Sequence, residues 1–289
     1  MSVDIVMRTL DRPLFLQRAL DDIVAQTYND WRLIIVNDGG APGPVDEAIA
    51  AHPELAGRTQ TLHLPETTGR AAATKAGIDA GSSELIVWHD DDDTWHPAFL
   101  ERTTAFLQSS DADAVAVRTE IVWEQVCSDR IVETGREVFH EFMLEPTFFD
   151  MLRFNHVVPI SLLYRRSVHD RIGPVDMRLK AVSDWEFNLR LWSQGTVGFI
   201  DEILAYWHQR RDESGAAANS VHRDRDAHVL YDRRVRDEAV REYVQANGAG
   251  ELLYLAKYVD ERTGDLHARI DRIEENQREA LRLIRSLRR

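Results

Sequence analysis

The sequence predicts an α/β protein with a mixed, mostly parallel sheet flanked by helices, followed by a C-terminal helical extension. Three observations support this fold class. The first hundred residues alternate between β-rich apolar runs and runs with helical spacing, as parallel strands joined by helices do. Residues 112–207 mix longer extended runs with helices. Beyond residue 220 the chain is almost entirely helical in pattern and rich in Arg, Asp and Glu.

The elements of the first hundred residues follow one another in strand–helix order. Pro13 suits the first turn of a helix, and apolar residues follow it at helical spacing up to Val24. Asn37 to Gly40 form a turn signal that ends the second strand. The expected strands are 3–7, 31–36, 59–64 and 84–88, and the expected helices are 13–24, 44–51, 69–80 and 97–107. Ligands are expected at the carboxyl ends of such strands.

The second part of the chain has a different pattern. Two extended runs in succession suggest a hairpin, and a helix, a strand, a helix and a last strand follow. In order, these elements are expected at 114–126, 130–138, 146–154, 160–164, 183–192 and 200–207.

Composition limits the class of protein. Apolar residues make up 44% and charged residues 29% of the 289 residues, which excludes disordered, collagen-like and disulfide-scaffold proteins. The single cysteine, Cys127, excludes an intramolecular disulfide and fits a reducing compartment. No apolar run is long enough to cross a bilayer, and the N-terminal residues do not resemble a signal peptide.

The net charge is −14, so a general nucleic-acid-binding surface is not expected, because such surfaces are basic. A phosphorylated ligand would need a metal ion or local arginines beside so many carboxylates.

The strongest chemical signal is the run Asp90, Asp91, Asp92 and Asp93 after a hydrophobic strand. Adjacent carboxylates repel one another unless a cation is present, and Mg²⁺ is commonly held by one or two carboxylates together with substrate phosphates. Asp90 and Asp92 point the same way on an extended segment. The alternative is an acidic cap for the helix expected near Pro97.

Two further carboxylates stand at element ends, and the residues alone leave two interpretations of each. Asp38 ends a strand, where it could accept a hydrogen bond from a nucleobase or satisfy its own turn. Asp184 follows Ser183 at the start of a helix, where it could cap that helix or act at a reaction centre with Trp185 as a wall.

Taken together, these segments resemble family 2 glycosyltransferases of the GT-A fold over roughly residues 2–215. The matching segments are 3–9 with 11–13 and 34–39, then Gly69 to Gly77, then the Asp90–Asp93 run with Trp95 and Pro97 as an Asp-x-Asp motif, then 172–176 with 183–186, and finally 206–208 with Ser214. The sequence departs from the family at Arg8, where a proline is common. The resemblance implies a catalytic domain over 1–215, with a nucleotide-sugar half at 1–110 and an acceptor half at 111–215.

The resemblance also implies site residues. Asp184 would be the general base, and Asp92 and His208 would lie at a Mn²⁺ or Mg²⁺ ion. The residues expected around the nucleotide-sugar are Thr9, Asp11, Arg12, Asp38, Arg70, Lys75, Asp90 and Asp91.

The implied activity is transfer of a sugar from a nucleotide-diphospho-sugar to a hydroxyl, with inversion at the anomeric carbon, in the cytoplasm. The implied acceptor is a glycan or a lipid-linked glycan of surface polysaccharide biosynthesis. Two alternatives are a sugar-phosphate nucleotidyltransferase, which usually has a glycine-rich loop where residues 8–13 stand, and a non-catalytic scaffold that keeps the fold.

The chain ends in a helical extension, 216–264, and an amphipathic tail, 265–289. Gly264 is expected to interrupt the helix, with Thr263 or Asp265 as a cap. The tail has a 4-3 apolar spacing that predicts a coiled coil and hence a homo-oligomer, a dimer. A helix docked on its own domain and a helix at the inner face of the membrane are the alternatives. The positions of the seam are Leu266, Ile270, Ile273, Gln277, Ala280, Ile284 and Leu287.

Overall fold

The structure, a computed structural model, describes residues 1–127, 130–211 and 213–287. The chain divides into two compact units, residues 1–233 and 234–289. The first unit therefore includes the expected catalytic domain and also the first part of the segment expected to be a separate helical extension.

The N-terminal half follows the predicted order of elements. Each expected strand and helix is present, with bounds within a few residues of those predicted. The elements are β1 (Val3–Thr9), α1 (Pro13–Val24), β2 (Trp31–Asp38), α2 (Pro42–Ala50), a short 3-10 turn (Pro53–Leu55), β3 (Thr59–Leu64), α3 (Arg70–Ala80), β4 (Leu85–Asp90) and α4 (Phe99–Gln108).

The remaining elements also match, with short additions that the sequence patterns did not indicate. A two-residue strand, β5 (Thr94–Trp95), and a five-residue helix, α6 (Val168–Ile172), are too short to show a period. The other elements are β6 (Ala114–Cys127), β7 (Arg130–Val138), α5 (Phe148–Arg153), β8 (Leu162–Arg165), α7 (Ser183–Gln194), β9 (Val197–Gln209), α8 (Ser220–Arg223), α9 (Arg225–Asn247) and α10 (Gly250–Leu287).

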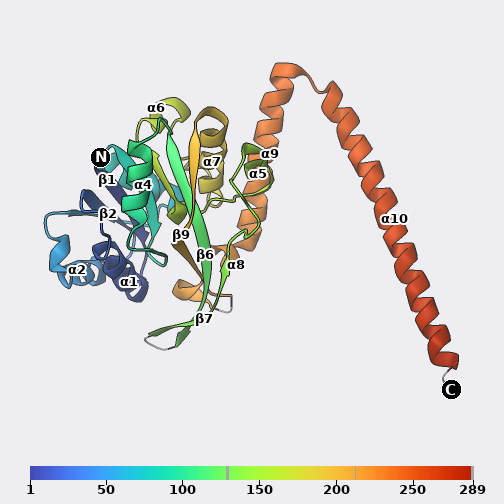
Figure 1. Ribbon diagram of the computed structural model, residues 1–289, viewed down its shortest axis with the longest axis horizontal. Helices are drawn as coiled ribbons and strands as arrows, with labels where there is room; N and C mark the ends of the chain where they lie inside the picture. Colours follow the sequence, from blue (N-terminus) through green and yellow to red (C-terminus); the bar gives the residue numbers. More distant parts are fainter. Residues whose placement is uncertain (128–129, 212, 288–289) are drawn as a thin grey trace. The chain divides into compact units, whose positions relative to one another are not determined.

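Within the described residues, the strands form one mixed nine-stranded sheet in the order β3-β2-β1-β4-β8-β6-β9-β5, and β7 pairs with β6 (Figure 1). The β1–β2, β2–β3 and β1–β4 pairs are parallel, as predicted. Antiparallel β8 joins this half to β6, which pairs in parallel with β9. The carboxyl ends of β1, β2 and β4 therefore meet at one edge of the sheet.

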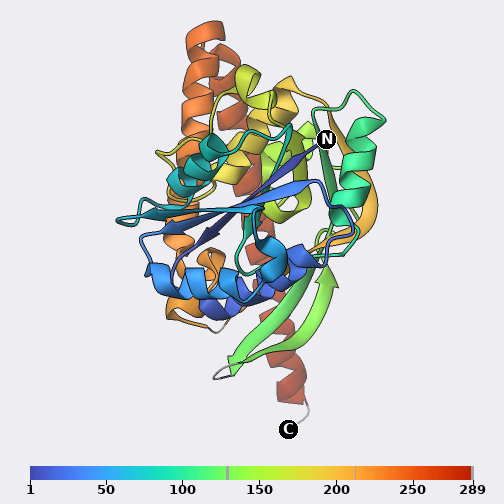
Figure 2. The ribbon, with the colours of Figure 1, turned by 90° about the vertical axis from the view of Figure 1, so that its left-hand side faces the viewer.

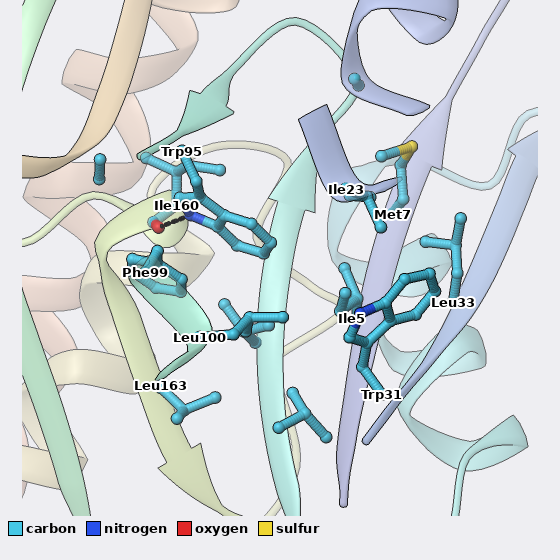
Figure 3. Close-up of a cluster of buried hydrophobic side chains, with 14 of the residues drawn as sticks. Ile5, Met7, Ile23, Trp31, Leu33, Trp95, Phe99, Leu100, Ile160 and Leu163 are labelled. Atoms are coloured by element: carbon cyan, nitrogen blue, oxygen red, sulfur yellow. Dashed lines mark hydrogen bonds between the residues drawn. The ribbon is translucent and has the colours of Figure 1, made fainter. Parts of the chain in front are cut away.

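Alternate residues of β1 face two different layers of helices. Val3, Ile5 and Met7 pack in the main apolar core with residues of α1, α2 and α4. In Figure 3 the Trp95 indole in this core donates a hydrogen bond to the Ile160 carbonyl oxygen, 2.7 Å away. Val6 faces the opposite layer, where α3 covers the sheet (Figure 2). The strands that end at the carboxyl edge are thus covered on both faces.

The second unit contains the last part of α9 and the long helix α10, which runs through Gly264 without a break. The predicted interruption at Gly264 is therefore wrong. Gly248, which has a φ of +81°, lies between α9 and α10 and takes the left-handed conformation that glycine adopts readily. No helix in the described part of the chain is both long enough and apolar enough to cross a membrane.

Candidate active site

A cavity of about 480 Å³ lies at the carboxyl ends of β1, β2 and β4. Most of the predicted nucleotide-sugar and metal residues line it, because they end these strands or begin the segments after them. The predicted residues in its lining are Thr9, Asp11, Arg12, Asp38, Arg70, Asp90, Asp91 and Asp92. Three predicted site residues, Lys75, Asp184 and His208, are not among its lining residues.

Asp38 fastens the loop that leads into α3. Its carboxylate accepts hydrogen bonds from the backbone N–H groups of Thr68, at 2.7 Å, and Gly69, at 3.0 Å, and from the Thr68 hydroxyl at 2.8 Å. Asp38 therefore shapes the wall of the cavity rather than only satisfying its own turn.

Arginines surround the aspartate run. Arg12 donates to Asp91 Oδ1 at 2.9 Å and to Asp92 Oδ2 at 2.6 Å, and the Thr9 hydroxyl donates to Asp91 Oδ2 at 2.7 Å. Arg8 pairs with Asp90, its partner in the register of β1 and β4. The guanidinium groups of Arg8 and Arg12 therefore supply part of the positive charge that these adjacent carboxylates require.

A second set of ion pairs lies deeper in the protein, beneath Asp92. Arg210 has no exposed surface, and its guanidinium pairs with Asp92 and with Glu124, the latter at 3.0 Å. Arg18 also pairs with Glu124. The alternative that the aspartates cap the following helix is wrong, because α4 begins after Ala98 and has no side-chain cap.

The surroundings shift the pKa values of Asp91, Asp92 and Asp93 in different directions. Burial disfavours charge on Asp92, but the guanidinium groups of Arg12 and Arg210 outweigh it and lower its pKa. Burial raises the pKa of Asp91 to about 6, against the opposing charge of Arg12. Burial, reinforced by the charge of Asp92, raises the pKa of Asp93 well above its usual value. The run therefore carries less than its full negative charge in mildly acidic solution.

The donor set fits a divalent cation held jointly with a ligand. No hydrogen bond from the described residues reaches Oδ2 of Asp90 or Oδ1 of Asp92. No three His, Cys, Asp or Glu side chains of the described ranges converge on a metal position. Mg²⁺ commonly needs only one or two carboxylates, with phosphate oxygens and water completing its coordination, so two carboxylates with free oxygens suffice.

His208 is engaged on both sides of its ring. Its Nδ1 lies 2.5 Å from Glu124 Oε1, and its Nε2 lies 2.7 Å from the Thr94 hydroxyl. Burial lowers the pKa of His208, although the Glu124 carboxylate favours the charged form. A bond from His208 to a metal would replace one of these hydrogen bonds, so its role as a ligand stays a prediction.

Asp184 lies in the first turn of α7, and Val182 occupies the cap position without a side-chain cap. The Oδ2 atom of Asp184 accepts a hydrogen bond of 2.7 Å from the Asn155 amide. Its charge acts on Arg8 and Arg70, which line the cavity. Asp184 is therefore not used for helix capping, and it lies close enough to Arg8 and Arg70 for its charge to favour their protonated forms.

Lys75 pairs with Asp79 one helical turn further along α3. Its predicted contact with the nucleotide-sugar therefore stays a prediction.

Several residues of the site carry no signal in the sequence patterns. Glu124 lies far from the aspartate run in sequence, and it reaches the site on β6, which pairs with β9. Lys180 and Arg223 line the cavity from segments with no recognisable motif. Arg8 was visible as a departure from the family pattern.

Comparison with known proteins identifies related chains. The sequence profile of glycosyl transferase family 2 matches residues 4–173. The uncharacterized glycosyltransferase YwdF of Bacillus subtilis (strain 168) is 32% identical over 190 residues, which are 66% of this chain and 68% of YwdF. A PGL/p-HBAD biosynthesis glycosyltransferase of Mycobacterium tuberculosis (strain ATCC 25177 / H37Ra) is 26% identical over 75% of this chain and 79% of its own.

Solved structures share the fold. The crystal structure of S. aureus TarS 1–349 superposes with a TM-score of 0.60 and 16% identity over 72% of this chain, and the match spans 60% of the TarS chain. The mannosyltransferase PcManGT from Pyrobaculum calidifontis, in complex with GDP-Man and Mn²⁺, superposes with a TM-score of 0.58 and 17% identity over 83% of this chain and 64% of its own. The α/β sheet, its helices and the profile match agree with the predicted GT-A fold, and the chain belongs to glycosyl transferase family 2.

Proposed function

We propose that this glycosyltransferase moves a sugar from a nucleotide-diphospho-sugar to a hydroxyl of a glycan or lipid-linked glycan, with a Mn²⁺ or Mg²⁺ ion and with inversion at the anomeric carbon. The observation that carries the proposal is the cavity at the carboxyl ends of β1, β2 and β4, which brings Asp38 from the end of β2 beside Asp90 and Asp92, at the end of β4 and in the turn after it.

The nucleotide-sugar class is supported by the neighbours and by charge. TarS 1–349 has been solved with UDP and with UDP-GlcNAc, and PcManGT with GDP-Man. In this chain Arg8 and Arg70 both line the cavity. Burial lowers the pKa of Arg70, and the neighbouring charge of Arg8 lowers it further. A diphosphate beside these two cations would stabilise both, which favours an anionic donor.

Asp92 and Asp90 would hold the metal through their free carboxylate oxygens, with His208 as a further expected ligand. When bound, the ion would act as a Lewis acid that stabilises the departing diphosphate. Arg12 and Arg210 fix the other oxygen of Asp92, so the carboxylate presents Oδ1 in one orientation.

Asp184 would act as the general base on the acceptor hydroxyl. The proton passes to its carboxylate while the acceptor oxygen bonds the anomeric carbon and the bond to the diphosphate breaks. A single displacement from the opposite face inverts the configuration, and it requires no second carboxylate nucleophile.

The two alternative functions are less well supported. A nucleotidyltransferase is not favoured, because the family match covers residues 4–173. A scaffold without activity does not require an aspartate such as Asp184, whose side chain does not cap α7 and whose charge acts on Arg8 in the cavity lining.

Donor binding tests the proposal directly. The full chain is screened by thermal shift against UDP- and GDP-sugars, each with Mn²⁺, Mg²⁺ or a chelator, because a ligand that binds only the folded state raises its stability. We expect one donor class to raise Tm only with metal, and Asp92→Asn to lose this shift. Asp30→Asn, at an exposed aspartate outside the cavity lining, is the matched control.

A chain that responds to no nucleotide-sugar in any metal would contradict the proposed donor class. A donor shift that persists in chelator, or in Asp92→Asn, would contradict the metal site and leave the donor site standing.

A further inference from the structure

Asn155 lies between α5 and β8 and contacts the proposed base. Its Nδ2 donates to Asp184 Oδ2 at 2.7 Å, across 29 positions of the chain. This is the one hydrogen bond that the described residues make to the Asp184 carboxylate. The other carboxylate oxygen, Oδ1, is therefore left without a donor from the described part of the protein.

The orientation of the Asn155 amide is determined by its other partners. Its Oδ1 accepts from the backbone N–H of Val157 at 3.3 Å and from the side-chain amide of Asn188 at 3.1 Å. A backbone N–H can only donate, so the amide oxygen faces Val157. The amide nitrogen must then face Asp184, where it can only donate.

The orientation of the Asn188 amide is also determined by its hydrogen bonds. Its Nδ2 also donates to the Val157 carbonyl oxygen at 2.9 Å, and the side chain is 3% exposed. Asn188 follows Asp184 by four residues on α7, so the two side chains lie on one face of the helix. Asn155 hydrogen-bonds both Asp184 and Asn188 on that face, and backbone groups of Val157 bind both asparagine side chains.

Charged groups from other elements also face Asp184. Burial lowers the pKa values of Arg70 on α3 and His228 on α9, and the charge of Asp184 opposes this lowering. Burial also opposes the charge on Arg8 on β1, but Asp90, and to a lesser extent Asp184, raise its pKa. The carboxylate thus lies near the basic groups of Arg8 and Arg70, and among the described residues Asn155 supplies its hydrogen-bond donor.

We propose that Asn155, held by Asn188, is a positioning residue for the base Asp184. The inference rests on the proposed function of the site. The amide can only donate, so it binds one carboxylate oxygen and leaves Oδ1 to accept the proton of the acceptor hydroxyl. The bonding electrons of the sugar–phosphate bond leave with the diphosphate, and the proton ends on Asp184.

Three variants of the full chain test the inference: Asp184→Asn, Asn155→Ala and Asn155→Asp. The control is Asn29→Ala, whose exposed amide bonds the backbone oxygen of Thr27. The readouts are donor affinity by thermal shift and release of nucleoside diphosphate from that donor, with water as the acceptor, as a function of pH.

We expect donor affinity to stay within about twofold in all variants, because Asn155 and Asp184 lie outside the lining of the donor cavity. Loss of the base should slow release about 10²–10⁴-fold in Asp184→Asn. Asn155→Ala should slow release about tenfold, which is a smaller loss because the base remains. In Asn155→Asp two carboxylates share one contact, so the acidic limb of the rate–pH profile should move to higher pH.

The outcomes separate the two proposals. If Asp184→Asn releases diphosphate as fast as the wild type, the base assignment in the proposed function fails. If Asp184→Asn is slow while both Asn155 variants keep the wild-type rate and pH profile, the positioning role is wrong. Asn155→Asp preserves the shape of the side chain. If the Asn155→Ala protein does not fold, the rate–pH profile of Asn155→Asp still decides the question.

Discussion

Arg210 shows how the chain neutralises its own aspartate run. A guanidinium with no exposed surface lies between Asp92 and Glu124, and its Nε donates to the Ala217 carbonyl oxygen at 2.7 Å. Buried charges are tolerated when they are paired and their hydrogen-bonding groups are satisfied. The aspartates can therefore stay together in the folded protein before any metal binds.

Replacing Arg210 should destabilise the protein strongly. Arg210→Met leaves the carboxylates of Asp92 and Glu124 buried with one cation fewer, and breaking a buried pair typically costs about 3–5 kcal/mol. The measurement is the free energy of unfolding in urea. The control is Arg102→Met, which breaks an exposed pair with Glu202 and should cost less than about 1 kcal/mol. Equal effects of the two variants would contradict the buried network.

Asp91 should make stability depend on pH in the acidic range. Burial raises its pKa to about 6, whereas an aspartate of an unfolded chain titrates near pH 3.9. The folded state binds the proton more tightly, so the contribution of Asp91 to stability is fully present below about pH 4. It is lost as the pH rises through about 6.

In Asp91→Asn this titration is absent. The free energy of unfolding of the wild type, measured in urea with chelator, should therefore decline relative to Asp91→Asn between about pH 4 and pH 7. Asp30→Asn, at an exposed aspartate, is the control for the loss of one carboxylate from the chain. A constant difference between wild type and Asp91→Asn would mean that Asp91 titrates normally.

At the scale of elements, α3 is held against β1 by a close approach at Gly77. A Cβ atom added at Gly77 would lie 2.4 Å from Val6 Cγ1, so any side chain there would push the helix off the sheet. The same helix begins beside Gly69, whose backbone N–H bonds Asp38, and it carries Arg70 to the cavity. Packing at Gly77 thus affects the geometry of the site.

Two Gly→Ala substitutions should have opposite effects. Gly77→Ala overpacks the contact with Val6 and should destabilise the first unit by about 1–3 kcal/mol in urea unfolding. Gly264→Ala, within α10, meets no atom within 4 Å and should stabilise that helix by about 1 kcal/mol, seen as increased helicity by circular dichroism. A neutral Gly77→Ala would mean that α3 has room to shift.

At the scale of the molecule, the second unit presents an apolar seam on α10. Leu266, Ile270 and Ile273 follow the predicted 4-3 spacing and are each more than half exposed. The side chains of Ile284 and Leu287, the last two predicted positions, lie outside the described part of the chain. An apolar stripe of this spacing is typical of helices that pair with a second helix.

We propose that the protein is a dimer joined partly through α10. A chain ending at Gly248 removes the whole helix and keeps every proposed site residue. Light scattering should give a dimeric mass for the full chain and a mass shifted toward the monomer for the shortened one, while donor binding stays unchanged. A monomeric full-length protein would contradict the proposal and favour a docked helix or a membrane-surface helix.

The sequence by itself determined the longer strands and helices and the edge at which ligands are expected. Apolar periodicity and turn residues act locally, so β1, β2 and β4 and their terminal residues Thr9, Asp38 and Asp90 could be placed from neighbouring residues alone. The predicted break at Gly264 failed because a single glycine costs a helix only about 1 kcal/mol, which the 38 residues of α10 outweigh.

Only the tertiary structure decided which groups meet at that edge. Arg210 reaches Asp92 across 118 positions, and Asn155 reaches Asp184 across 29, with no spacing rule that links them. Such contacts depend on how the sheet and α7 pack, because a hydrogen bond joins any donor and acceptor that packing brings together. Local patterns therefore indicated where the site lies, and long-range packing selected the partners that orient and charge it.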